Sequence, residues 1–166
     1  MMRYAGLLCH AATVAVDVPA EEALAFMADG IALGRWAMGC WNTRRAGANL
    51  FVGHSLFDQS EGWVRIAVDR KLLNVDYHVG PSPARLKHQN TARVIPGADV
   101  GRNPRTCLVT LLAWRPGDMS DADWNRICLT HEAEMLLIQA WLGRRGRGAR
   151  GAPAARRPRA GRRLKR

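Results

Sequence analysis

Between residues 38 and 115 the sequence is a succession of short β-type runs separated by turn residues. Within several runs apolar side chains alternate with polar ones, the period of a strand that buries one face. Most of the intervening turns are short enough for hairpins, which join neighbouring strands in antiparallel order. The stretch therefore predicts an antiparallel meander. Its strand candidates are residues 50–57, 63–69, 73–79, 91–95 and 106–114, with a weaker one at 40–45.

Two of these runs indicate which face of the sheet is buried. Apolar and polar side chains occupy alternate positions in these runs, so one face of the sheet is apolar and the opposite face is exposed to solvent. The apolar set is Val64, Ile66, Val68, Val75, Tyr77 and Val79. The run 107–114 is apolar on both faces, and we expect it to be central or covered on both sides.

A strand and a helix are predicted before the meander. Residues 10–18 alternate like a strand, and Pro19 followed by Glu21 and Glu22 is typical of a first helical turn. Proline is tolerated there, and acids suit the positive end of the helix dipole. We expect a helix over residues 19–29 that Gly30 stops, followed by a second short helical turn up to Trp36.

One long helix is predicted after the meander. Ser120 with Asp121 and Asp123 reads as an N-cap with acids in the first turn, and the helix should run some twenty residues to Gly143. Its apolar stripe recurs at spacings of four and three. The members of the stripe are Trp124, Cys128, His131, Met135, Ile138 and Leu142. The stripe fits the apolar face of the predicted sheet.

The charges divide the chain into two parts. Residues 144–166 carry eleven basic side chains and no acid, whereas residues 1–143 hold 14 basic and 14 acidic side chains. The C-terminal stretch is rich in Gly, Pro and Ala, so it cannot bury enough apolar surface to offset its ordering entropy. We expect a folded domain over residues 1–143 and a disordered basic tail over residues 144–166. No run is long enough to span a membrane and no clean signal cleavage site follows the N-terminus, so we expect a cytoplasmic protein.

The predicted element order resembles the START-like, polyketide cyclase/dehydrase (SRPBCC) superfamily, which has the helix-grip fold. The resemblance covers nearly all of residues 8–142 and none of the tail. It implies an α+β domain in which a curved antiparallel sheet of about seven strands wraps around the long C-terminal helix, with one or two short helices after the first strand. The residues that carry it are 16–22, Trp36, 64–69, 75–77, Thr110, Leu111 and the helix from Asp121.

The resemblance also implies a ligand. Proteins with this fold hold an apolar molecule, such as a lipid, polyketide or hormone, in a cavity between the sheet and the long helix. We therefore expect a small hydrophobic or amphipathic ligand. The residues expected to bind it are His131, Tyr77, His54, Trp114, Trp124, Met135 and Arg35.

His131 is the most informative of these, because it interrupts an apolar stripe and a buried ring needs a partner. A core histidine bonded to a backbone group or to Tyr77 is preferred to a catalytic base. Glu134 lies three residues on, so a His and carboxylate pair is geometrically available. We nevertheless expect Glu132 and Glu134 to face solvent, and the Tyr77 hydroxyl to satisfy a core contact.

Other polar residues have plainer explanations. Both faces of the run around His54 are equally apolar, so its position in the run does not show whether the side chain points inward or outward. Asp76 and His78 share a polar strand face, and a solvated pair is preferred to a metal site because no motif places a third ligand. Arg35, near the expected cavity mouth, could meet a ligand carboxylate or phosphate, but a surface salt bridge is the ordinary outcome.

Three classes of function stay open. The leading hypothesis is ligand binding without assigned catalysis, with no cofactor and no metal, by a monomer or dimer. The second is a cyclase, dehydratase or hydrolase that uses His131 with Tyr77, His54 or Glu134. The third is non-specific binding of nucleic acid or anionic surfaces through the basic tail. The sequence contains no phosphate-binding loop, nucleophile elbow or paired metal motif, and its four cysteines are isolated.

Overall fold

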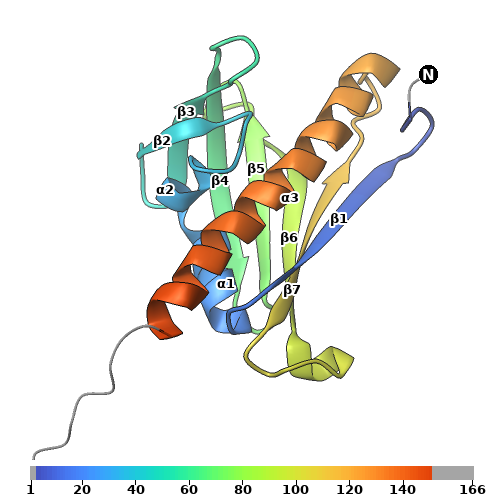
Figure 1. Cartoon of the computed structure of the whole chain (residues 1–166). Helices are drawn as coiled ribbons and strands as arrows, with labels where there is room; N and C mark the ends of the chain where they lie inside the picture. Colours follow the sequence, from blue (N-terminus) through green and yellow to red (C-terminus); the bar gives the residue numbers. More distant parts are fainter. Residues whose placement is uncertain (1–2, 151–166) are drawn as a thin grey trace, which may run out of the picture.

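The computed structural model describes residues 3–150 of the chain. Its seven strands form one antiparallel sheet, and the long helix α3 crosses that sheet diagonally (Figure 1). The strand order β1-β7-β6-β5-β4-β3-β2 leaves β1 and β2 at the two edges. The predicted α+β architecture is confirmed. The strands are β1 (Cys9–Val16), β2 (Trp41–Arg45), β3 (Leu50–His54), β4 (Glu61–Asp69), β5 (Asn74–Gly80), β6 (Lys87–Pro96) and β7 (Cys107–Trp114).

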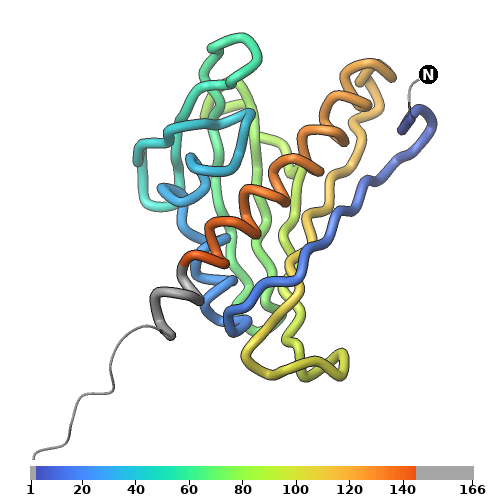
Figure 2. The backbone as a smooth tube through the Cα atoms, in the orientation of Figure 1, coloured from blue at the N-terminus to red at the C-terminus, as the bar shows by residue number. Residues whose placement is uncertain are grey.

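The first strand pairs with the last one, although they lie at opposite ends of the fold's sequence (Figure 2). Thr13 of β1 is opposite Thr110 of β7, and their hydroxyl oxygens are 2.9 Å apart. The other strands follow one another as hairpins, as the meander predicted. The long-range pairing of β1 matters for the site, because it brings the start of the chain beside α3, which packs on β1 and β7.

Strand β6 begins at Lys87, four positions before the run that the sequence predicted. Its first residues are polar, so hydrophobic alternation could not reveal them. A register shift between Tyr77 and His78 leaves Gln89 as an extra residue, because Tyr77 faces Asn90 while His78 faces His88. Such a bulge redirects side chains locally, and it lies where β6 borders the pocket described below.

Two short helices, α1 (Ala20–Ala28) and α2 (Gly30–Leu33), connect β1 to β2. Gly30 does not simply end a helix, as we expected, but is the first residue of α2, and the Asp29 side chain caps it by accepting the Ile31 N–H at 2.8 Å. A Cβ on Gly30 would collide with the Phe51 ring, so glycine allows α2 to approach β3. The buried face of α1 contributes Phe26 and Met27 to the core.

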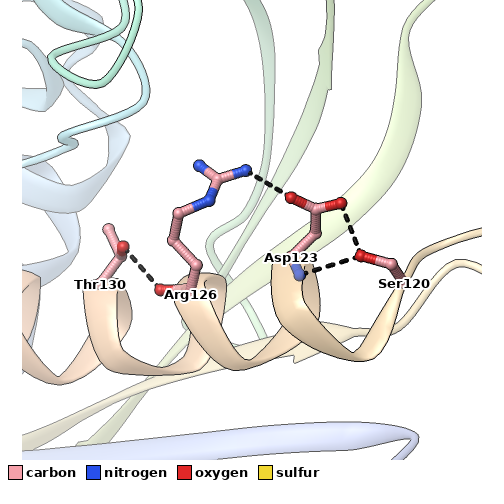
Figure 3. A network of polar contacts seen from close by, with 4 residues as sticks. All are labelled: Ser120, Asp123, Arg126 and Thr130. Atoms are coloured by element: carbon pink, nitrogen blue, oxygen red, sulfur yellow. Dashed lines mark hydrogen bonds and ion pairs between the residues drawn. The ribbon is translucent and has the colours of Figure 1, made fainter.

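Helix α3 (Asp121–Arg150) begins as predicted. The Ser120 hydroxyl accepts the Asp123 N–H at 3.1 Å and donates to the Asp123 carboxylate at 2.7 Å, and Arg126 lies 3.0 Å from the same carboxylate (Figure 3). These contacts satisfy one of the free N–H groups at the helix start and place an acid near the positive end of the dipole.

The other end of α3 differs from our expectation. We expected the helix to end at Gly143, but it continues to Arg150. An interior glycine costs only about 1 kcal/mol relative to alanine, and although Gly146 and Gly148 also follow, the other residues of 144–150 are four arginines and one alanine, which are good helix formers. Of the predicted disordered tail over 144–166, residues 151–166 lie outside the described part of the chain. The division into a domain and a tail stays a prediction.

The core lies between the sheet and the helices. The predicted α3 stripe is buried throughout, and its two apolar halves belong to different clusters. Met135, Ile138 and Leu142 join the main core with α1 and the inner sheet face, whereas Trp124 and Cys128 pack with Tyr4 and Ala113. His131 lies between the two halves along the helix. No helix within residues 3–150 has the length and apolar character needed to cross a bilayer.

Candidate functional site

A pocket of about 560 Å³ lies against α3 on the inner side of the sheet. Its volume is in the range of small-molecule sites. The helix contributes Ile127, Thr130, His131 and Glu134, and the opposite walls come from the strands, the end of α2 and the segment after it. Those opposite walls include Leu33, Trp36, Ala37, Trp63, Val64, Tyr77, Val79, Asn90 and Leu111.

Three polar atoms of the residues that line the pocket are buried without a hydrogen-bond partner. They are Nε1 of Trp36, Oδ1 of Asn90 and Nδ1 of His131. Leaving a buried donor or acceptor unpaired costs about 1–3 kcal/mol, so a partner supplied by a ligand or a water molecule would stabilise the protein. Sequence reasoning missed Asn90, because it lies in the polar start of β6 that hydrophobic alternation does not mark.

Glu134 lines the pocket and is only 6% exposed, so our expectation that it faces solvent is wrong. The segment after α2 covers it, and the Met38 N–H donates to Oε1 at 2.8 Å. Burial raises the pKa of Glu134 to about 8, although the Met38 N–H opposes this shift by stabilising the carboxylate. At neutral pH Glu134 is therefore mostly a carboxylic acid.

His131 is 4% exposed, and its Nε2 lies 3.9 Å from Oε2 of Glu134. It is not bonded to Tyr77, as the preferred sequence explanation allowed, because the Tyr77 hydroxyl donates to the Met27 carbonyl at 2.7 Å. That bond confirms the core contact expected for Tyr77. Burial, with a smaller effect of His10, lowers the pKa of His131 to about 4. The His131 and Glu134 pair is therefore uncharged near neutral pH.

His10 connects this pair to the edge of the molecule. Its ring centroid is 5.9 Å from that of His131, and its Nε2 is 3.9 Å from Oε1 of Glu132. Glu132 is partly exposed, accepts a hydrogen bond from the Tyr4 hydroxyl and lies 3.7 Å from Arg3. The sequence did not single out His10, because its neighbours on α3 depend on the long-range pairing of β1 with β7.

Comparisons with known proteins identify the fold. No protein-family model matches the sequence, and no curated protein matches it. Among solved structures, a START superfamily protein from Mycobacterium smegmatis has a TM-score of 0.61 at 10% identity, over 82% of this chain and 97% of its own. The Zhui aromatase/cyclase from Streptomyces sp. R1128 has a TM-score of 0.61 at 15% identity, over 87% and 98%. The Aha1 dimer from Colwellia psychrerythraea has a TM-score of 0.60 at 10% identity, over 82% and 97%.

The chain has the START-like helix-grip fold. At these identities the likeness shows the fold alone, so the predicted resemblance is confirmed at that level. Within this START-like domain, His131 and Tyr77 line the pocket, and the other residues that we expected to bind a ligand do not. Ligand binding by any of them stays a prediction.

Those other residues lie in five different places. Trp124 and Met135 are packed in the two core clusters. Trp114, 41% exposed, contacts His88 with ring centroids 5.3 Å apart. His54 ends β3 opposite Trp41 and Glu61 in the strand ladders. Arg35 lies over the Trp141 ring, 5.2 Å from its centroid, rather than in a salt bridge.

The outer face of the START-like sheet carries a separate polar cluster. Asp76 accepts hydrogen bonds from Thr91 at 2.6 Å and Asn74 at 2.9 Å, and His88 lies 3.3 Å away. Burial opposes ionisation of Asp76, but these hydrogen bonds prevail and lower its pKa. His78 stacks on His88 rather than ligating with Asp76, and no metal-binding group of His, Cys, Asp and Glu occurs within residues 3–150.

Proposed function

We propose that this protein binds a small, neutral, largely apolar molecule with oxygen functions in the pocket between the sheet and α3. One observation carries the proposal: Trp36, Asn90 and His131 all line one pocket, and each carries a buried polar atom without a hydrogen-bond partner. The indole N–H needs an acceptor and the amide oxygen needs a donor. A hydroxyl group on an apolar skeleton supplies both kinds of bond, and a carbonyl group supplies the acceptor for the indole N–H.

The charges around the pocket favour a neutral ligand. His131 and Glu134 are uncharged near pH 7 for the reasons given above. The other charged residues on the pocket wall are already paired and largely exposed: Arg126 lies 3.0 Å from Asp123, and Glu61 lies 3.7 Å from Arg44. An anionic ligand would have no free buried cation to meet within the described residues, and burying its charge unpaired would be costly.

The comparisons support the same function without naming the ligand. A solved neighbour of the same fold is an aromatase/cyclase, and another belongs to the START superfamily. Native mass spectrometry of the purified full-length protein tests for a co-purified small molecule directly. Calorimetric titration with 2-tetralone, a neutral bicyclic ketone, then tests the pocket itself.

A pair of matched variants locates the binding. Ala37→Phe places a ring in the pocket, whereas Ala67→Phe places the same ring on an exposed position of β4. We expect the first variant to weaken 2-tetralone binding at least about 10-fold, because filling a site removes the volume that the ligand occupies. The second should bind like the wild type. Equal affinities in the two variants would contradict the proposed location, and absence of binding in the wild type would contradict the function.

A second candidate function rests on charge alone. Residues 144–166 carry eleven basic side chains without an acid, which favours sequence-independent contact with polyanions. We expect the full chain to bind duplex DNA with an affinity that falls steeply with salt, and a chain ending at Arg150 to bind more weakly with a shallower salt slope. Equal weak binding by both chains would remove this candidate.

A further inference from the structure

The pocket holds a base and an acid side by side, beyond the groups that a ligand needs for binding. His131 and Glu134 both line it, both are more than nine-tenths buried, and 3.9 Å separates Nε2 from Oε2. The Met38 N–H is bonded to Oε1 of Glu134. That bond orients the carboxyl group and leaves Oε2, the oxygen next to His131, to exchange a proton.

We propose that this pair transfers protons to and from a carbonyl compound in the pocket and so interconverts its keto and enol forms. The inference rests on the ligand-binding function proposed above. His131 removes a proton from the carbon beside the carbonyl, while the Glu134 carboxylic acid donates its proton to the carbonyl oxygen. The C–H electron pair becomes the C=C bond, the carbonyl π pair forms the new O–H bond, and no oxidant or reductant is needed.

The cycle closes within the pair. Enolisation leaves an imidazolium at His131 and a carboxylate at Glu134, and transfer of one proton from the first to the second restores both starting groups. Burial prepares these starting groups, since it lowers the pKa of His131 to about 4 and raises the pKa of Glu134 to about 8. Between these values the base is free and the acid is protonated, as general acid–base catalysis requires.

His10 and Glu132 connect the pair to solvent as positioning residues. His10 lies between the His131 ring and the Glu132 carboxylate, and Glu132 is 41% exposed. Burial lowers the pKa of His10, while the Glu132 charge opposes that shift and Arg3 adds to it. Nδ1 of each histidine is unpartnered, so a water molecule or a ring rotation can pass a proton between the rings. The other titratable groups on the pocket wall are Tyr77, Cys40, Glu61 and Arg126.

Deuterium exchange tests the proposal. Full-length protein is incubated with 2-tetralone in deuterated buffer near neutral pH, and the loss of the proton signals beside the carbonyl is followed by NMR. We expect Glu134→Gln and His131→Gln each to slow the protein-dependent exchange by about 100-fold or more, the usual scale of general acid–base catalysis. Glu21→Gln is the matched control, because it makes the same change of a carboxyl group to an amide at an exposed position of α1, outside the pocket. It should stay within twofold of the wild type.

Two readouts separate proton transfer from a structural role. The wild-type exchange rate should form a plateau between the pKa values of His131 and Glu134 and fall on either side, and Glu134→Gln should abolish the alkaline limb. His10→Gln should slow deuterium incorporation without changing the affinity for 2-tetralone. A rate that does not depend on pH, or a His10→Gln variant that loses affinity and exchange together, contradicts the assigned roles.

Calorimetric titration on the same samples distinguishes failure of this inference from failure of ligand binding. Bound 2-tetralone that exchanges at the buffer rate overturns proton transfer and leaves ligand binding intact. Exchange that survives in both Glu134→Gln and His131→Gln also overturns it. Absence of 2-tetralone binding up to its solubility limit counts against both proposals.

Discussion

Replacing Glu134 by glutamine should make the protein more stable, and increasingly so as the pH rises. Glutamine has nearly the same shape as glutamate and keeps a carbonyl oxygen for the Met38 N–H, which now donates to Oε1 at 2.8 Å. The substitution removes only the group that titrates. The expected gain follows from where this carboxyl group lies, 6% exposed against the pocket.

The size of the effect follows from the two pKa values of this carboxyl group. Its pKa is about 8 in the folded protein and 4.5 without burial. Between these values the unfolded chain releases its proton while the folded protein keeps it, so the free energy of unfolding falls as the pH rises. Each pH unit in this window corresponds to about 1.4 kcal/mol. From pH 5 to 7.5 the wild type should lose about 3 kcal/mol relative to Glu134→Gln.

Urea unfolding followed by tryptophan fluorescence at several pH values between 5 and 7.5 measures this difference. Glu21→Gln is the control, because it removes an exposed carboxylate from the first turn of α1 and should change stability by less than about 0.5 kcal/mol. A stability difference between Glu134→Gln and the wild type that stays constant with pH would refute the reasoning. It would mean that Glu134 is ionised in the folded protein and that the pocket does not hold a carboxylic acid.

Three further outcomes are expected. The wild type should become less stable than His131→Gln as the pH falls. Burial lowers the pKa of His131 from 6.5 to about 4, so the wild type should lose about 3 kcal/mol relative to this variant across that pH range. A difference in the free energy of urea unfolding that does not change with pH would contradict this expectation. Ser120→Ala should cost about 1 kcal/mol through loss of the α3 cap, measured by thermal unfolding, and an unchanged midpoint would count against that cap. Gly30→Ala should cost about 1–3 kcal/mol because its methyl group meets the Phe51 ring, whereas Gly117→Ala, with open space around it, should leave the urea midpoint unchanged.

The predictable part of the fold was the part with local signals. Alternating apolar residues identified the strands of the meander, and the Ser120 cap marked the start of α3. Where the signal was weak, the prediction failed. The polar start of β6 from Lys87 has no alternation to detect, and Gly143 lies inside α3 because a glycine without a left-handed turn does not end a helix.

The site was less predictable than the fold. The α3 stripe identified His131 as buried, but it placed Glu134 in solvent, because a helix pattern does not show that the segment after α2 passes over that position. Trp124 and Met135 are on the predicted buried face and still lie outside the pocket. A buried face covers both core and cavity, and periodicity does not distinguish them.

The amino-acid sequence by itself determined the elements, their order and the side of each that is buried, because those properties depend on residues close together along the chain. Only the tertiary structure decided which polar groups meet. Trp36, Asn90 and the α3 pair of His131 and Glu134 come from separate parts of the chain and line one pocket, and His10 joins them through the pairing of β1 with β7. Their pKa values and unpaired hydrogen-bonding groups arise from burial by distant parts of the chain, which no local pattern encodes.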